Sequence, residues 1–121
     1  MPSRKLLFVD DNELNRIVMQ DMLEILFEDL EVEIYESADE VLALDVQSYD
    51  LILSDIDMPR ISGFELHDML REKHNYKKPI IAVTALAVTG DREKMLMHGF
   101  DDYISKPIDI DILETTIQKY I

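Results

Sequence analysis

Short runs of aliphatic residues alternate along this chain with longer stretches in which apolar residues recur every three or four positions. The runs at 6–9, 32–35, 51–53, 80–83 and 103–104 predict five strands. Helical spacing is clearest after the first run, where the apolar residues are Leu14, Ile17, Val18, Met22, Ile25 and Leu26. Five strand–helix units without an internal linker or repeat predict an α/β domain, in which helices cover both faces of a parallel sheet.

Several residues mark where the predicted helices begin and end. Ser37 followed by Glu40 is a capping-box pattern that opens a short helix. Another helix is expected over about 89–98, and Gly99 lies where a left-handed residue commonly ends a helix. Asp109 is placed to cap the last helix.

Composition and charge narrow the class of protein. The chain has 121 residues, so we expect one domain over 1–121 with a single sizeable core. Twelve basic and 26 acidic residues give a net charge of −14, which argues against binding to nucleic acid or to an anionic membrane. No apolar run approaches the roughly 20 residues of a membrane span. Asp10 and Asp11 interrupt the first apolar run too early for a signal peptide, and the chain has no cysteine. We therefore expect a cytoplasmic protein.

Polar residues with a shared chemistry lie at the ends of four predicted strands. They are Asp10 with Asp11, Asp55, Thr84 and Lys106. In open α/β sheets ligands bind beyond the carboxyl ends of the strands, so these side chains are expected to converge. Three carboxylates, a hydroxyl and an ammonium group suit a divalent cation together with a phosphoryl group. The sequence therefore predicts a phosphorylation site, with Asp55 as the nucleophile that forms an acyl phosphate.

Each of these residues also has an ordinary structural interpretation. Asp10 or Asp11 is an acceptable helix N-cap, and Asp55 is an acceptable cap or turn residue before Pro59. Thr84 is by itself a common β-branched core residue, and Lys106 before Pro107 needs to mean only a turn.

Asp57, Tyr103 and the histidines are more ambiguous. The backbone carbonyl of Asp57 is placed to complete a metal shell, although its side chain is equally placed to steer a water molecule or to crowd the phosphoryl group. Tyr103 is either a core aromatic residue or a ring that moves with Thr84. His67, His74 and His98 show no metal-ligand spacing, and we expect them on the surface.

Four segments, taken in order, resemble the receiver domain of two-component response regulators. They are Val-Asp-Asp-Asn-Glu-Leu-Asn at 9–15, Asp-Ile-Asp-Met-Pro at 55–59, Val-Thr-Ala at 83–85 and Ile-Ser-Lys-Pro at 104–107. The resemblance covers essentially the whole chain. It implies a flavodoxin-like (βα)5 sandwich whose parallel sheet has the strand order 2-1-3-4-5.

The resemblance also implies roles for the residues that match these segments. Asp55 corresponds to the phosphoacceptor, and Asp10 and Asp11 correspond to the acidic pair that binds Mg²⁺, for which Mn²⁺ is an expected substitute. The carbonyl of Asp57 would complete the metal site. This chain departs from the family pattern at variable positions, with an acidic side chain at Asp57 and an apolar one at Leu86.

The remaining implied roles concern switching. Lys106 corresponds to the lysine that binds the phosphoryl group, Thr84 to the switch hydroxyl and Tyr103 to the switch aromatic residue. Phosphorylation would alter the surface formed by the fourth helix, fifth strand and fifth helix. The output would be protein binding, because the chain carries no basic recognition helix.

The resemblance implies a signalling domain that catalyses only its own phosphotransfer and dephosphorylation. The expected partners are a sensor histidine kinase or a histidine phosphotransfer domain, and a downstream protein that the sequence does not identify. Met1 and the last helix favour a single-domain regulator over a fragment of a hybrid kinase. Two alternatives stay open: a phosphatase of the haloacid-dehalogenase type, because of Asp55 and Asp57, and an interaction module that has lost its switch.

Overall fold

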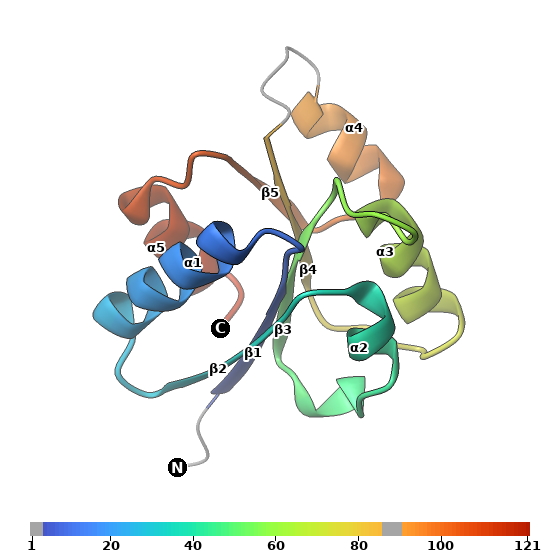
Figure 1. Cartoon of the computed structure of the whole chain (residues 1–121), viewed down its shortest axis with the longest axis horizontal. Coiled ribbons are helices and arrows are strands. Elements are labelled where there is room, and N and C mark those ends of the chain that lie inside the picture. The colour runs from blue at the N-terminus through green and yellow to red at the C-terminus, as the bar shows by residue number, and fades with distance from the viewer. Residues whose placement is uncertain (1–3, 86–90) are drawn as a thin grey trace.

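Parallel strands form one continuous sheet at the centre of the molecule (Figure 1). The computed structural model describes residues 4–85 and 91–121, and within them the sheet has five strands in the order β2-β1-β3-β4-β5. Their bounds are β1 (Arg4–Val9), β2 (Leu30–Tyr35), β3 (Leu51–Asp55), β4 (Ile80–Thr84) and β5 (Asp102–Ser105). The parallel α/β fold and the strand order expected from the family resemblance are both confirmed.

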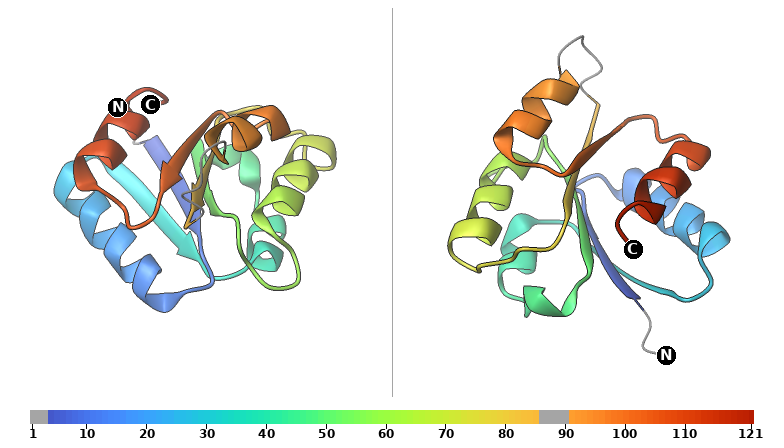
Figure 2. Two further views of the ribbon diagram at one scale, coloured as in Figure 1. Left: turned by 90° about the horizontal axis from the view of Figure 1, so that it is seen from above. Right: turned by 180° about the vertical axis from the view of Figure 1, so that it is seen from behind.

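Helices cover both faces of this sheet. They are α1 (Glu13–Leu26), α2 (Ala38–Leu42), α3 (Gly63–Glu72), α4 (Asp91–His98) and α5 (Ile110–Gln118), with a 3-10 turn at η1 (Val46–Ser48). Figures 1 and 2 show α1 and α5 on one face and α2, α3 and α4 on the other. The result is a sandwich of three layers.

Two apolar cores follow from the alternation of side chains along the strands. In β1, Leu6 and Phe8 belong to the core beneath α1 and α5, whereas Leu7 and Val9 belong to the core beneath α2, α3 and α4. Every residue of β3 and β4 is buried. These strands read as continuous apolar runs because both of their faces are covered.

The helix caps show which polar residues near the helix starts have a structural role and which are left as candidates for a functional one. Asn12 is the N-cap of α1, and its side chain accepts a hydrogen bond from the amide of Asn15. Neither Asp10 nor Asp11 is therefore needed as a cap. Ser37 and Asp109 are confirmed as N-caps, because both side chains accept hydrogen bonds from the first turns of their helices. The return bond of the capping box differs from the prediction, because the carboxylate of Glu40 accepts from the amide of Glu36 and not from that of Ser37.

The end of α4 also agrees with the sequence. Gly99 has a φ of 124°, and the amide of Phe100 donates to the carbonyl of Met95. This backbone closes the helix in the left-handed manner that glycine favours. The expected start of this helix near 89 and the departure at Leu86 lie outside the described residues.

The helical pattern of α1 does not coincide with its buried face. Met19 and Leu23 are buried, but Leu14, Ile17 and Ile25 are 67%, 50% and 73% exposed. The helix therefore presents apolar side chains outward. In the described part of the chain, no helix is both long enough and apolar enough to cross a bilayer.

Candidate functional site

Strand pairing brings the candidate residues to one edge of the sheet. Val9 pairs with Ser54, so Asp10 follows β1 at the level where Asp55 ends β3. Asp55 pairs with Val83, immediately before Thr84 at the end of β4. Thr84 in turn pairs with Ser105, and Lys106 follows. The predicted convergence of strand ends is thus present in the register of the sheet.

Lys106 joins two of the predicted carboxylates. Its ammonium nitrogen lies 2.9 Å from Oδ2 of Asp10 and 3.0 Å from Oδ1 of Asp55. Its backbone amide donates to the carbonyl of Thr84 at 2.8 Å, which fixes the chain beside β4. The peptide bond from Lys106 to Pro107 is cis. Both ion pairs are largely shielded from solvent.

The three predicted acids form what we call the acidic cluster: Asp10, Asp11 and Asp55. One carboxylate oxygen from each lies within 4.8 Å of the others. Asp10 and Asp55 are buried, whereas Asp11 is exposed. The cluster is therefore closed on the protein side and open to solvent through Asp11.

Electrostatics within the cluster leave negative charge incompletely balanced. Burial, together with repulsion from Asp10, raises the pKa of Asp55 to about 6, even though Lys106 acts in the opposite direction. Burial acts to lower the pKa of Lys106, but its hydrogen bonds to Asp10 and Asp55 outweigh this and raise it above the ordinary value. A single ammonium group serves two buried carboxylates. The donor set contains only oxygen, which suits a hard cation such as Mg²⁺.

The loop after β3 is held close to Asp55 by Gly63, the first residue of α3. The amide of Gly63 donates to the carbonyl of Ile56 at 2.9 Å. A Cβ atom at this position would overlap the backbone carbonyl of Asp55 and the backbone of Ile56. The hydroxyl of Ser54 donates to the same Asp55 carbonyl at 2.9 Å. The backbone on both sides of Asp55 is therefore tightly packed.

The other predicted site residues lie around this cluster. Thr84 is buried at the end of β4. Tyr103, in β5, is half-buried and packs against the core beneath α2, α3 and α4. The side chain of Asp57 is exposed. These positions are compatible with the predicted roles, which stay predictions.

Arg16 is a site residue that the sequence interpretation missed. Its guanidinium nitrogen Nη1 donates to the carbonyl of Asp10 at 2.9 Å, and Nη2 lies 3.7 Å from Glu36. The available signal was its spacing, because residue 16 falls one helical turn after Asn12, the N-cap of the helix that follows the acidic pair. Arg16 therefore stabilises the turn that contains Asp10 through this hydrogen bond.

The prediction that the histidines lie on the surface was wrong for His67. This side chain is 5% exposed and lies between α3 and the end of α4. Its Nδ1 lies 3.0 Å from Oδ1 of Asp68. The centroid of its ring lies 5.2 Å from that of His98. His67 and His98 are far apart in sequence, and only the packing of α4 beside α3 brings them together.

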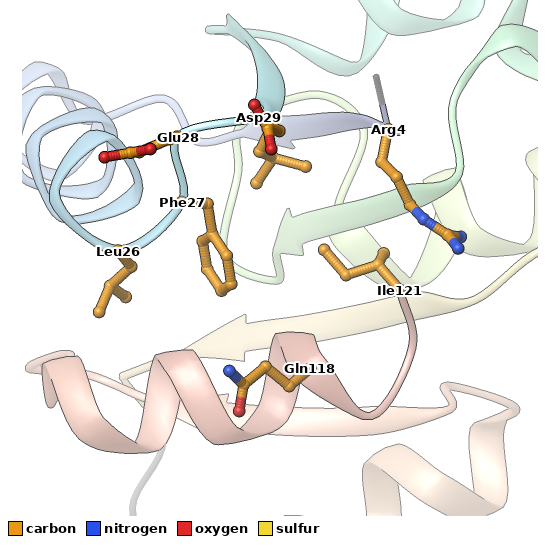
Figure 3. A pocket seen from close by; sticks show the side chains of 8 residues that line it. Arg4, Leu26, Phe27, Glu28, Asp29, Gln118 and Ile121 are labelled. Atoms are coloured by element: carbon orange, nitrogen blue, oxygen red, sulfur yellow. The ribbon is translucent and has the colours of Figure 1, made fainter. Parts of the chain in front are cut away.

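A hollow of about 450 Å³ lies at the other end of the sheet, away from the acidic cluster. It is bounded by Arg4, by Leu26 and Phe27 at the end of α1, and by Gln118 and Ile121 (Figure 3). Arg4 begins β1, whereas Asp10 follows its carboxyl end. This hollow therefore takes no part in the candidate site.

A family model matches nearly the whole chain. The model for the response regulator receiver domain covers residues 6–118. The polar-differentiation response regulator DivK of Brucella ovis is 36% identical over 122 residues, which span 98% of this chain and 97% of DivK. Hybrid signal transduction histidine kinase G of Dictyostelium discoideum is 37% identical over 119 residues. These span 96% of this chain but only 4% of that kinase.

Solved structures agree with the sequence comparison. The receiver domain of sensor histidine kinase PA1611 from Pseudomonas aeruginosa, with a magnesium ion in its active site cleft, is 33% identical and has a TM-score of 0.82. The alignment covers 98% of this chain and 97% of that one. The receiver domain of Ssk1 from Saccharomyces cerevisiae, crystallised with the histidine phosphotransfer protein Ypd1, is 25% identical with a TM-score of 0.84. That alignment covers 98% of this chain and 89% of the other.

Proposed function

Because the chain belongs to the response regulator receiver domain family of two-component systems, we propose that Asp55 accepts a phosphoryl group from a phosphohistidine. The observation that carries this proposal is the position of Asp55. It is buried within the acidic cluster, and its carboxylate oxygen lies 3.0 Å from the ammonium group of Lys106. The family match over residues 6–118 also favours this function over a phosphatase of the haloacid-dehalogenase type.

Asp10, Asp11 and Asp55 are the residues that would hold Mg²⁺, and Mn²⁺ is the expected substitute. Their oxygens already lie within 4.8 Å of one another, and the raised pKa of Asp55 reflects charge that a cation would offset. The backbone carbonyl of Asp57 is the fourth protein ligand in this proposal. When bound, the ion would supply positive charge close to the oxygens of the incoming phosphoryl group.

The proposed transfer uses the carboxylate of Asp55 as nucleophile. One of its oxygens attacks phosphorus, the P–N bond to the donor imidazole breaks, and the imidazole leaves with the bonding electron pair. An acyl phosphate then remains on Asp55. Lys106 positions the carboxylate beforehand and offers its ammonium group to a phosphoryl oxygen afterwards. The domain thus catalyses only its own phosphorylation and, by attack of water, its own dephosphorylation.

The donor is proposed to dock on α1, beside the acidic cluster. Leu14 and Ile17 are exposed there, and a hollow of about 240 Å³ lies between α1 and the segment from Lys106 to Ile108. The structural neighbour Ssk1 was crystallised with a histidine phosphotransfer protein. A phosphotransfer domain or a sensor histidine kinase is therefore the class of donor proposed for this chain.

The proposed output is a change in the surface made by α4, β5 and α5. Thr84 would move toward the phosphoryl group and Tyr103 would follow into the space it leaves. Met97 on α4 is 87% exposed and Ile112 on α5 is 53% exposed, so this surface already presents apolar side chains to a protein partner. A shift from mostly inactive to mostly active requires about 5.5 kcal/mol of preferential stabilisation, which contacts to the phosphoryl group must provide.

Phosphorylation of Asp55 is tested by mass measurement of the intact protein after incubation with acetyl phosphate and Mg²⁺. The wild type is expected to gain one phosphoryl group and Asp55→Asn none. Asp57→Asn is the matched control, because it changes an exposed carboxylate two residues away and keeps the backbone carbonyl. Equal uptake by Asp55→Asn and the wild type would overturn the assignment.

A further inference from the structure

A second group of metal-type ligands lies between α3 and α4, outside the phosphorylation site. It contains His67 and Asp68 from α3 and His98, the last residue of α4, and we call it the histidine cluster. Oδ1 of Asp68 lies 3.0 Å from Nδ1 of His67 and 2.9 Å from Nε2 of His98. One oxygen and two imidazole nitrogens thus converge within 4.8 Å.

The ligand chemistry of the histidine cluster differs from that of the acidic cluster. Two imidazoles and one carboxylate are the protein ligands of many zinc sites, whereas Mg²⁺ prefers oxygen alone. Ligand atoms on a tetrahedral zinc ion lie about 3.3 Å apart, given bond lengths of about 2.0–2.1 Å. The two contacts of Asp68 are only slightly shorter than this spacing. Small side-chain adjustments would therefore admit an ion.

One of the two ring nitrogens of the buried His67 has no hydrogen-bond partner in the described part of the chain. Within the described residues, its Nε2 is the one buried side-chain polar atom without a hydrogen-bond partner. Buried polar atoms are nearly always paired, so an orphaned nitrogen calls for a further reason to keep an imidazole at this position. Nδ1, not this orphaned Nε2, is the nitrogen that faces Asp68, and a metal ion bound at Nδ1 would leave the ring proton on Nε2 still unpaired; the case for an ion therefore rests on the convergence of the three ligand atoms.

The surroundings of the histidine cluster are apolar on one side and open on the other. The rings of Phe64 and Phe100 contact that of His98 at centroid distances of 4.8 and 5.8 Å. Asp68 and His98 are only half-buried, so one side of the cluster faces solvent. Three protein ligands and an open position for water form a coordination shell that is known for Zn²⁺ in proteins.

We propose that His67, Asp68 and His98 bind a divalent transition-metal ion of the Zn²⁺ type between α3 and α4. His98 ends α4, and the other two ligands lie on α3, so the ion would join the two helices by direct bonds. One of these helices belongs to the proposed output surface. The site is separate from the acidic cluster and shares no residue with it.

Cobalt absorption gives a direct readout, because Co²⁺ in a tetrahedral site with nitrogen ligands absorbs visible light strongly, whereas Co²⁺ in an octahedral site with oxygen ligands absorbs only weakly. The full chain is titrated with Co²⁺ and then with Zn²⁺ in excess Mg²⁺, which occupies the acidic cluster. We expect saturable visible absorption at one equivalent of Co²⁺, which Zn²⁺ abolishes. His98→Gln should weaken binding by about tenfold or more, since it removes an imidazole ligand, and Asp68→Asn should weaken it because it removes the negative charge of the carboxylate ligand.

His74→Gln is the matched control, because it removes the remaining histidine, which lies outside the cluster. Asp55→Asn is a second control that disables the acidic cluster alone. Both are expected to bind Co²⁺ as the wild type does. The proposal is overturned if the wild type shows no saturable visible bands, or if His98→Gln binds Co²⁺ as tightly as His74→Gln. The first result would mean that the cluster is held by hydrogen bonds only.

Discussion

The ammonium nitrogen of Lys106 lies 3.0 Å from the carboxylate of Asp55, although the two residues are 51 positions apart in the sequence. The same nitrogen lies 2.9 Å from Asp10, so one positive charge is shared by two buried negative charges. This arrangement leaves the pocket short of positive charge. Both the free energy of unfolding and the ionisation of Asp55 should therefore respond to any change of charge at this site.

Replacement of Lys106 by Met is expected to destabilise the protein at pH 7. The change keeps the length of the side chain but leaves Asp10 and Asp55 without their ammonium partner. Loss of one partner of a buried ion pair costs about 3–5 kcal/mol. Urea unfolding at pH 7 measures the free energy, with the exposed Lys77→Met as control. A loss below about 1 kcal/mol would show that water already screens these carboxylates.

Replacement of Asp55 by Asn is expected to stabilise the metal-free protein, and the gain should depend on pH. The pKa of Asp55 is raised from 3.8 to about 6, so the folded state holds this proton more tightly than the unfolded state does. Its stabilising contribution is complete below about pH 4 and is lost as the pH rises through about 6. The asparagine variant should therefore match the wild type near pH 4 and exceed it by up to about 3 kcal/mol at pH 7.5.

Urea unfolding at several pH values in the presence of a chelator measures this difference. Added Mg²⁺ is expected to reduce it, because a bound cation stabilises the ionised wild type more than a variant that lacks one of the three carboxylates. The exposed Asp57→Asn should follow the wild-type profile. A variant that is less stable than the wild type at pH 7.5 would refute the charge deficit at Asp55.

Replacement of Asp11 by Asn is expected to weaken Mg²⁺ binding with little effect on folding. Asp11 is exposed, so its carboxylate can be removed without leaving a cavity or a buried orphan. Loss of a direct ligand should cost about tenfold or more in affinity. The Mg²⁺ dependence of the melting temperature reports this, with the exposed Glu13→Gln on α1 as control. Equal Mg²⁺ dependence in both variants would exclude Asp11 as a ligand.

Replacement of Gly63 by Ala is expected to destabilise the fold even though alanine is the better helix former. A Cβ atom at this position would overlap the backbone carbonyl of Asp55 and the backbone of Ile56, neither of which can rotate away. Overpacking of this kind costs about 1–3 kcal/mol. Urea unfolding and phosphoryl uptake should both suffer. The exposed Glu72→Ala, at the other end of α3, should change neither.

Pattern and strand-end chemistry were sufficient to predict which charged side chains lie together at this edge of the sheet. The site residues that lie at the ends of apolar runs are Asp10, Asp55 and Lys106. Parallel pairing of strands places the carboxyl ends of such runs together, independently of how the helices pack. The sequence did not reveal that Lys106 forms an ion pair with Asp10 as well as with Asp55. That sharing depends on how far the side chain reaches across the sheet, and residue spacing carries no information about it.

The histidine cluster shows why other features were not predictable. His67 and Asp68 are adjacent in sequence, but their partner His98 comes from another helix, and the angle between α3 and α4 decides whether the rings meet. Likewise, the spacing of apolar residues in α1 predicted the helix but not its inward face. Leu14 and Ile17 satisfy the helical period equally well whether they face the sheet or the solvent.

Replacement of Ile17 by Glu is expected to separate docking from chemistry. Ile17 is 50% exposed on α1, close to the exposed Leu14 that borders the hollow beside Lys106. A charge there should weaken binding to a phosphorylated histidine phosphotransfer domain and slow transfer from it by about tenfold or more, because it would place an unpaired carboxylate in a desolvated contact. Uptake from acetyl phosphate, which needs no docking surface, should not change. Ile25→Glu is the control, since it is 73% exposed but lies about 12 Å further along the same helix. Equal slowing by both variants, or slowing with acetyl phosphate as well, would place the docking surface elsewhere.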